Sequence, residues 1–149
     1  MREILFRGKT DNGEWICGHY YTQGFHLDTI EEDWYHFIKP IGSKSWGEVR
    51  VIPQTVGQYT GLTDKNGTKI FEGDIVLFSW GDDRRRQPFY IEFVDGEFRA
   101  TPKESTENIW SIRIASYACD FEVIGNIHDN LELLEESEKT LKAREVEGK

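Results

Sequence analysis

The sequence feature that most constrains the fold is residues 58–77, which read QYTGLTDKNGTKIFEGDIVL. The pair Asn66-Gly67 lies between hydrophobic residues, and both residue types tolerate the positive φ that a type I′ hairpin turn requires. The pair Gly73-Asp74 precedes an aliphatic run, 75–77, which indicates a sharp corner leading into a buried strand. The stretch therefore predicts a hairpin followed by a core strand.

Two further turn signals of the same chemistry, Asn12-Gly13 and Asp95-Gly96, lie between short segments rich in aromatic and β-branched residues. Repeated short strands separated by such turns favour a barrel or a sandwich over parallel βαβ units. The segment 109–117 stays open, because its isoleucines fit both a strand and a helix. Strands are expected at 2–7, 14–22, 35–41, 49–52, 75–80, 88–94, 97–101 and 121–127.

The sequence resembles the YopX family, whose members are encoded by phages and prophages. The resemblance rests on three ordered blocks, which read MREILFRG at 1–8, TVGQYTGL to IFEGDIV at 55–76, and FEVIGNIHDN at 121–130. The chain departs from the family pattern at Leu131, where the family often has proline, and in the segment 25–50. The resemblance implies a β-rich fold with an SH3-like barrel element and a phage origin, and it carries over no catalytic or binding residues.

The fold class predicted for this chain is mainly β, an SH3-like small barrel with additional N-terminal β structure and a C-terminal α-helix. Residues 1–54 are expected to form a β segment packed on the barrel, and residues 55–129 the barrel core. Residues 130–149 are expected to form a helix, with Asn130 as its N-cap, followed by a frayed tail.

Charge excludes several kinds of partner. The 149 residues include 27 acidic and 18 basic side chains, which give a net charge of −9. A field of this sign repels phosphate backbones and anionic membranes, so nucleic-acid binding is disfavoured unless a local patch reverses it. No run approaches the roughly 20 apolar residues of a membrane span, and residues 1–20 lack the apolar region of a signal peptide. We therefore expect a cytoplasmic protein, with Cys17 and Cys119 as reduced, half-buried thiols.

The sequence gives little support to a catalytic or metal-binding function. Cys17, His19, His26 and His36 have the ligand chemistry of a zinc site, but their spacing matches no zinc-finger or HExxH pattern. The acidic residues at 64, 72 and 74 fit turn and corner chemistry better than a calcium loop. The chain also lacks P-loop, GxGxxG and GxSxG motifs. The expectation is a protein that is not an enzyme and has no cofactor, catalytic residue or metal ligand.

Two segments could form an interaction surface. Arg84, Arg85 and Arg86 lie in a strand-to-strand loop and could bind phosphates or carboxylates, although Asp82 and Asp83 reduce the local charge. Trp34, Tyr35 and Trp46 belong to an aromatic set that indicates either an exposed interface or a two-lobed core. On the segment 14–22, alternation places Trp15, Cys17, His19 and Tyr21 on one face.

These observations predict a phage- or prophage-derived accessory protein that is a non-catalytic protein-binding or assembly module. Its partner would be an unknown protein or a second copy of the chain. The alternative is a nucleic-acid-associated module that uses the loop Arg84 to Arg86. A metal-dependent hydrolase is a distant third.

Overall fold

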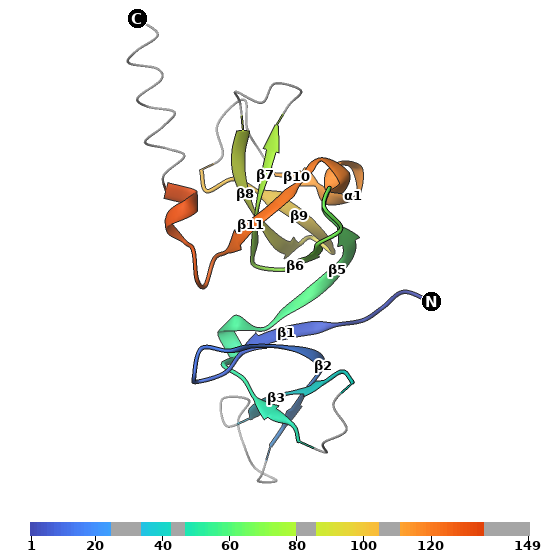
Figure 1. Cartoon of the computed structure of the whole chain (residues 1–149), viewed down its shortest axis with the longest axis vertical. Coiled ribbons are helices and arrows are strands. Elements are labelled where there is room, and N and C mark those ends of the chain that lie inside the picture. Colours follow the sequence, from blue (N-terminus) through green and yellow to red (C-terminus); the bar gives the residue numbers. More distant parts are fainter. Residues whose placement is uncertain (25–33, 43–46, 80–85, 105–110, 136–149) are drawn as a thin grey trace, which may run out of the picture. The chain divides into compact units, whose positions relative to one another are not determined.

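The computed structural model describes residues 1–24, 34–42, 47–79, 86–104 and 111–135 (Figure 1). The chain divides into two compact units, Met1–Gly61 and Leu62–Lys149. The boundary falls inside strand β5, Gly57–Thr63. Both units are built mainly from antiparallel strands, so the mainly β class predicted from the sequence is confirmed.

Unit 1 is an antiparallel sheet with the strand order β4-β3-β2-β1-β5. A hairpin joins β1 to β2, and β1 also pairs with the start of β5 through Phe6↔Gln58 and Arg7↔Gly57. A 3₁₀ turn, Pro53–Thr55, leads from β4 into β5. The strands of this unit before β5 are β1 (Phe6–Lys9), β2 (Trp15–Gln23), β3 (Tyr35–Pro40) and β4 (Val49–Arg50).

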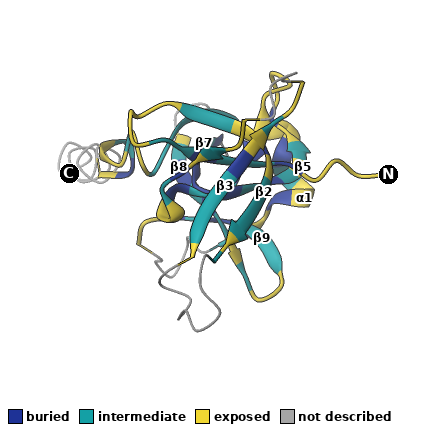
Figure 2. Cartoon of the chain, turned by 90° about the horizontal axis from the view of Figure 1, so that it is seen from below, coloured by how far each residue is buried: buried dark blue, intermediate teal, exposed yellow. Residues whose placement is uncertain are grey.

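Two glycines of unit 1 lie so close to neighbouring atoms that a larger residue would not fit. A Cβ at Gly8 would lie 2.9 Å from the Cβ of Val51 and 3.0 Å from the Cδ1 of Ile38. A Cβ at Gly18 would lie 1.9 Å from the carbonyl oxygen of Lys39 on β3. Ile38 is fully buried and Val51 is nearly so, and β3 carries a buried stretch (Figure 2). Gly8 therefore makes room for the aliphatic centre of the unit, whereas Gly18 makes room for the backbone of β3.

Unit 2 contains a five-stranded antiparallel sheet with the order β10-β9-β8-β7-β11. The short strand β6 is hydrogen-bonded to β5, and it ends the sheet that begins with β4. A helix α1, Ile114–Tyr117, and a 3₁₀ turn, Ala118–Asp120, connect β10 to β11. The strands are β6 (Lys69–Phe71), β7 (Asp74–Ser79), β8 (Arg86–Val94), β9 (Glu97–Thr101), β10 (Ile112–Arg113) and β11 (Glu122–Asn126).

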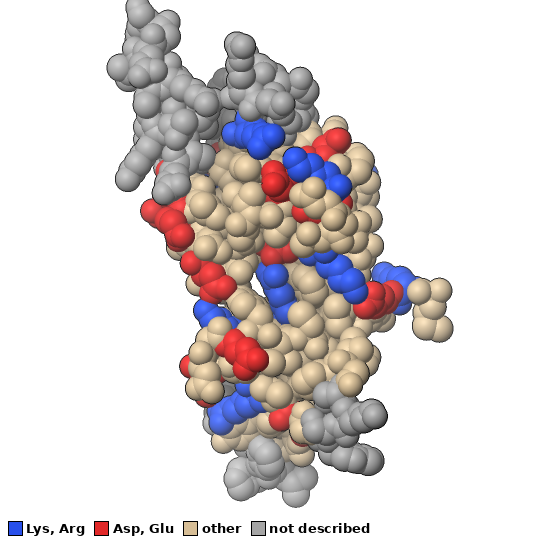
Figure 3. Space-filling view, viewed as in Figure 1, with Lys and Arg blue, Asp and Glu red and all other residues tan. Residues whose placement is uncertain are grey.

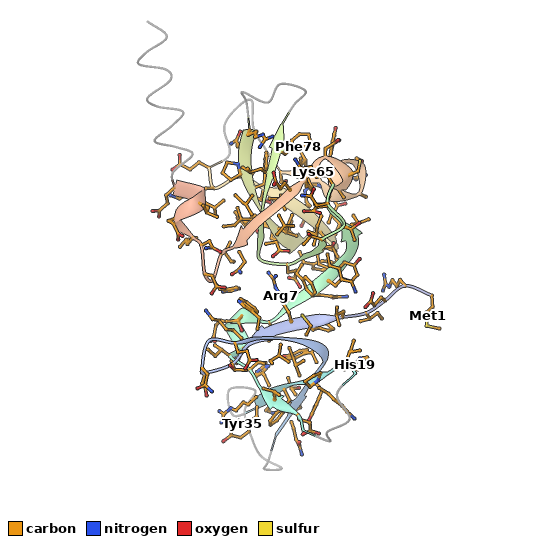
Figure 4. All side chains as sticks on the ribbon, viewed as in Figure 1. Met1, Arg7, His19, Tyr35, Lys65 and Phe78 are labelled. Atoms are coloured by element: carbon orange, nitrogen blue, oxygen red, sulfur yellow. The ribbon has the colours of Figure 1, made fainter. Side chains whose placement is uncertain are left out.

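Phe78, on β7, belongs to the buried core cluster of unit 2 (Figure 4). Its ring makes edge-on contacts with Phe89, Tyr117 and Phe121, with centroids 6.4, 5.3 and 5.4 Å away. Edge-on aromatic pairs contribute about 0.5–1.5 kcal/mol beyond the burial of their area. The rest of the cluster is aliphatic and comprises Ile70, Val76, Ile91, Ala100, Ile112, Ile114 and Ala118.

The three predicted hairpin turns are present, but they are of two kinds. Asp95 and Gly96 have φ of 52° and 81°, as a two-residue type I′ turn requires. Gly67 has φ of 80°, whereas among the described residues Asp95 is the one non-glycine with positive φ. The Gly67 N–H donates to the Asp64 carbonyl at 3.0 Å, and the Asp64 N–H to the Thr68 carbonyl at 2.8 Å. The type I′ prediction at Asn66-Gly67 was wrong, because this loop is a longer turn closed by one left-handed glycine.

The predicted SH3-like barrel is corrected, because the strands form two antiparallel sheets that do not close into a barrel. The reason lies in β5, whose first residues pair with β1 of the opening segment. The sequence left segment 109–117 undecided between a strand and a helix. Its described residues contain both, since β10 is followed directly by α1. Residues 132–135 are helical, and 136–149 lie outside the described residues. The Asn130 side chain accepts a hydrogen bond from the Asn126 N–H at 3.3 Å.

Candidate functional site

The register of unit 1 gathers aromatic and basic side chains on one face of its sheet. Arg7 pairs with Cys17 and Lys9 with Trp15 across β1 and β2, and Tyr21 pairs with Phe37 across β2 and β3. Residues opposite each other in an antiparallel pair project to the same side. We call this surface the cationic–aromatic face, and its aromatic and basic residues are Trp15, Tyr21, Tyr35, Phe37, Arg7, Lys9, Lys39 and Arg50.

The aromatic residues form a row across β2 and β3. The rings of Tyr21 and Phe37 are stacked, with centroids 5.5 Å apart and an interplanar angle of 24°. Tyr35 continues the row, with its centroid 6.5 Å from that of Phe37. These rings are half-buried, so part of each remains open to solvent. Cross-strand aromatic pairs stabilise the sheet by roughly 0.2–1 kcal/mol each, and they also hold the ring positions.

The cations of the face lie over its rings. The Arg50 guanidinium is 4.1 Å from the Tyr35 ring centroid, and the Arg7 guanidinium is 4.9 Å from that of Trp15. The Lys9 ammonium is 5.9 Å from the same Trp15 ring. Cation–π contacts at such partly exposed positions contribute about 0.5–1 kcal/mol each. Arg7 on β1 and Tyr35 on β3 are labelled in Figure 4.

The face carries charges of both signs. Beside its four cations it holds Glu48, which precedes β4. The Tyr21 hydroxyl is buried, and burial, followed by the nearby Glu48 carboxylate, raises the pKa of Tyr21 to about 12. On the surface that Figure 3 shows, basic and acidic side chains are interspersed.

The other face of the same strands belongs to the interior of unit 1. The Tyr20 ring lies 5.3 Å from that of Phe6 and 5.8 Å from that of His36, and the Tyr20 hydroxyl is hydrogen-bonded to His36 Nδ1. Burial raises the pKa of Tyr20. His36 is in register with Thr22, whereas Cys17 and His19 project from the cationic–aromatic face. The structure therefore separates His36 from Cys17 and His19, which share a face.

The other candidate residues are placed as follows. Arg86 begins β8, and its guanidinium lies 3.9 Å from Glu122 Oε2, which also lies 3.4 Å from the Lys65 ammonium. Tyr35 belongs to the cationic–aromatic face, and Trp34 is 43% exposed just before β3. Arg84, Arg85, Trp46 and His26 lie outside the described residues.

Sequence reasoning missed the basic half of the face. In the sequence, 43 positions separate Arg7 from Arg50, with Lys9 close to Arg7. The strand register places these residues on one face. The alternation of Trp15 and Tyr21 on one strand was the available signal. The cysteine prediction was also wrong in part, since Cys17 and Cys119 are free as expected but exposed rather than half-buried.

Comparison with known proteins agrees with the sequence resemblance. A family model described as YopX protein matches residues 5–135. The chain belongs to the YopX family. The crystal structure of protein EF1440 from Enterococcus faecalis is similar to this YopX-family chain, with 24% identity over 90% of this chain and 99% of that one, and a TM-score of 0.49. No curated protein sequence matches significantly. Within the described residues, no helix is long and apolar enough to cross a membrane.

The most distinctive block of this YopX-family sequence, residues 58–77, contains Asp64, whose carboxylate has a structural role. The residue is only 5% exposed. Its Oδ1 accepts hydrogen bonds from the N–H groups of Asn66 and Thr68, and its Oδ2 from that of Val123, all at 2.9 Å. Burial alone would raise the pKa of Asp64, but these three N–H groups and the Lys65 charge hold it below its ordinary value. Asp64 therefore joins the β5–β6 hairpin to β11, which is a structural role.

Gly73 and Asp74 form the second part of that block. Gly73 has φ of 85°, its N–H donates to the Ile91 carbonyl at 2.8 Å, and its carbonyl accepts from the Ile127 N–H at 2.8 Å. Asp74 is fully buried, and its Oδ2 accepts from the Phe71 N–H at 2.8 Å. Both residues thus fasten the corner between β6 and β7, as their sequence pattern indicates.

Proposed function

We propose that this YopX-family protein is a phage-derived accessory protein that acts as a non-catalytic binding or assembly module. Its binding surface is the cationic–aromatic face of unit 1. The observation that carries the proposal is the sharing of one sheet face by four aromatic rings and four cations. Trp, Tyr and Arg are the residues most enriched among those that dominate binding energy at interfaces.

The contacts within the face support binding because they organise it in advance. Arg50 is held over Tyr35, and Arg7 over Trp15, before any partner arrives. Ordering a long side chain at an interface costs about 0.5–1.5 kcal/mol, so side chains that are already placed lose less on binding. The exposed guanidinium of Arg50 favours a partner that carries negative charge.

Cys17 and His19 also project from this face, but its cations and rings suit recognition better than catalysis. Arginine stays charged at every physiological pH, and indole and phenyl rings do not exchange protons in this range. They can stack, exclude water and hold an anion in place. The family resemblance supports the phage origin, and the residue types of the face support a binding role.

The proposal is tested by retention from a bacterial lysate on immobilised protein. The face variant combines Tyr35→Ala with Arg50→Gln. The matched control combines Phe93→Ala with Arg113→Gln in unit 2, where Phe93 is 56% exposed and the Arg113 side chain 72%. Each variant removes one aromatic ring and one positive charge. Arg50 and Arg113 also have matching places, since each is the second residue of a two-residue strand.

We expect the wild type and the control to retain the same protein or nucleic acid at about 150 mM salt, where weak surface attraction is largely screened. The face variant should lose it. Thermal unfolding of all three proteins shows whether each is folded. Retention that is equal in all three, or no retention by the wild type, would contradict the proposal.

A further inference from the structure

We infer that a second copy of this chain pairs with strand β2, so that two copies share one continuous antiparallel sheet. The pairing site is the open edge, which we define as residues 20–23 on the β1 side of β2. Strand β1 pairs with β2 only as far as Phe6↔Gly18, whereas β3 continues to Gln23↔Tyr35. The inference goes beyond the proposed function, because it concerns an edge of the sheet and not the cationic–aromatic face.

The backbone groups of Tyr20 and Thr22 point toward the open edge. In an antiparallel pair, opposite residues alternate between exchanging two hydrogen bonds and turning away from each other. The His36 carbonyl accepts from the Val51 N–H at 3.0 Å, so the backbone of His36 is turned toward β4. Its register partner Thr22 is therefore turned away from β3, and so is Tyr20, two positions earlier.

The hydrogen bonds of β1 lead to the same result. The Leu5 carbonyl accepts from the Tyr59 N–H at 2.8 Å, so Leu5 is turned toward β5 and the next residue, Phe6, toward β2. Its register partner Gly18 faces β1, and the residues two and four positions later face the same side. Among the described residues none pairs with them there, because residues 1–4 run away from the sheet (Figures 1 and 2).

The open edge is complementary to itself. A two-fold axis through Tyr21 places Tyr20 of one copy opposite Thr22 of the other. In each of these two pairs both N–H groups donate to the opposite carbonyls, so every open group of both copies finds a partner. An anion could accept from the N–H groups but would leave the carbonyls without donors. The edge therefore calls for another extended polypeptide strand.

The open edge lacks the features by which proteins commonly prevent strand pairing. Such edges carry charged side chains, prolines or bulges, or are very short. Residues 19–23 read HYYTQ, with no acidic residue, lysine, arginine or proline, and their register with β3 has no bulge. The strands β4 and β10, which lie at sheet edges, are two residues long and carry Arg50 and Arg113.

The shortness of the open edge favours a strand that is already formed. A flexible segment must be ordered on binding, at a cost in conformational entropy comparable with the return from its backbone hydrogen bonds. Residues 1–4 illustrate this balance: continuing the register of β1 would pair Ile4 with Tyr20, yet Ile4 is 52% exposed. Strand β2 of a second copy is already held by its own β1 and β3, so it loses little freedom on pairing.

Pairing of this kind also doubles the proposed binding surface. Opposite residues in an antiparallel pair project to the same side of a sheet. The cationic–aromatic faces of the two copies would therefore lie on one side of the shared sheet. A partner with two binding sites could then engage both faces at once and bind more tightly than to one copy.

Disulfide cross-linking tests the pairing directly. Both native cysteines are exposed, so the background carries Cys17→Ser and Cys119→Ser. Tyr21→Cys places a thiol at the two-fold axis, where opposite Cα atoms lie about 4.5 Å apart, within the range of a disulfide. In the matched control Gln23→Cys, the two thiols are four positions apart along the paired strands, or about 13 Å. We expect mild oxidation to give a covalent dimer with Tyr21→Cys and a monomer with Gln23→Cys.

A proline at the open edge tests the hydrogen bonds. Thr22→Pro removes an N–H that faces away from β3, and proline is tolerated at such edge positions. Thr22→Val has a branched side chain and keeps the N–H. In analytical ultracentrifugation from micromolar to millimolar concentration, the wild type and Thr22→Val should associate alike. Thr22→Pro should raise the dissociation constant of the dimer at least about tenfold, because each pair loses a hydrogen bond and meets the proline ring.

Two results would overturn the inference. The first is a Tyr21→Cys protein that forms no more covalent dimer than Gln23→Cys. The second is a Thr22→Pro protein that associates as strongly as Thr22→Val, which would place self-association on another surface. Thermal unfolding shows that each variant is folded. Neither result bears on lysate retention, which the variant of Tyr35 and Arg50 tests separately.

Discussion

Replacement of Asp64 by asparagine should destabilise unit 2 in a way that depends on pH. The carboxylate accepts three backbone hydrogen bonds at 2.9 Å while 5% exposed. An amide keeps one acceptor oxygen but turns an NH₂ group toward at least one backbone donor. A hydrogen bond to a charged group contributes about 1.5–3 kcal/mol net, and part of this is offset by the burial of the charge.

We expect Asp64→Asn to lower the free energy of unfolding by about 2–3 kcal/mol, since it removes one bond and weakens the other two. For a chain of this size the midpoint of thermal unfolding should fall by about 5–10 °C. Circular dichroism follows the transition. Asp95→Asn makes the same chemical change at an exposed type I′ turn, where asparagine is favoured, and should stay within about 0.5 kcal/mol of the wild type.

The pH dependence gives a second readout. Because the pKa of Asp64 in the folded protein lies below its ordinary value of 3.8, the stabilisation is complete above pH 3.8 and is lost as the pH falls through the lower folded value. The difference between wild type and Asp64→Asn should therefore be constant near neutral pH and shrink under strongly acidic conditions. A difference below about 0.5 kcal/mol at pH 7, or one that does not change with acid, would refute this account.

Three other substitutions test separate parts of the structure. Gly18→Ala should prevent stable folding of unit 1, measured by thermal unfolding, because its Cβ would lie 1.9 Å from the Lys39 carbonyl oxygen. Arg99→Ala should cost about 2–3 kcal/mol in urea unfolding, because the guanidinium donates to the Ser111 Oγ at 2.9 Å and to its carbonyl at 2.8 Å. The Tyr21 phenol should ionise near pH 12 in an absorbance titration, against an ordinary pKa of 10.0.

Each of these has a matched comparison. Gly13→Ala meets only the Lys9 side chain at 3.7 Å, so it should cost about 1–2 kcal/mol for its left-handed φ of 82°. Arg113→Ala, on the neighbouring strand and mostly exposed, should cost less than 1 kcal/mol. Glu48→Gln should lower the pKa of Tyr21 only part of the way, since burial is the larger cause. Equal effects of Arg99→Ala and Arg113→Ala, or a Tyr21 titration near pH 10, would contradict the reasoning.

The local parts of this fold could be predicted from the sequence. Turns at Asn12-Gly13, Asn66-Gly67 and Asp95-Gly96 depend on residues whose backbone preferences act within a few positions. The corner at Gly73-Asp74 is of the same kind. Such preferences fix where strands end, which is why the predicted and observed strand positions agree closely along most of the described chain.

The arrangement of the sheets could not be predicted in the same way. The pairing of β1 with β5 joins Phe6 to Gln58, and no local preference records it. That pairing draws the start of β5 away from the barrel that the sequence suggested. The cationic–aromatic face depends on register as well, because Arg50 reaches Tyr35 only once β4 has paired with β3. The type I′ assignment at Asn66 failed because the turn is shaped by the Asp64 side chain.

The hydrogen bond between Asp64 and Val123 also has a consequence for the order in which the parts of the chain can fold. The two residues are 59 positions apart, so the hairpin that contains Asp64 emerges from the ribosome well before its partner strand exists. The strands β1 to β5, by contrast, are all present once residue 63 has emerged. During synthesis the first unit can therefore fold while the Asp64 carboxylate of the second unit is still exposed to water, because β11 has not yet been made.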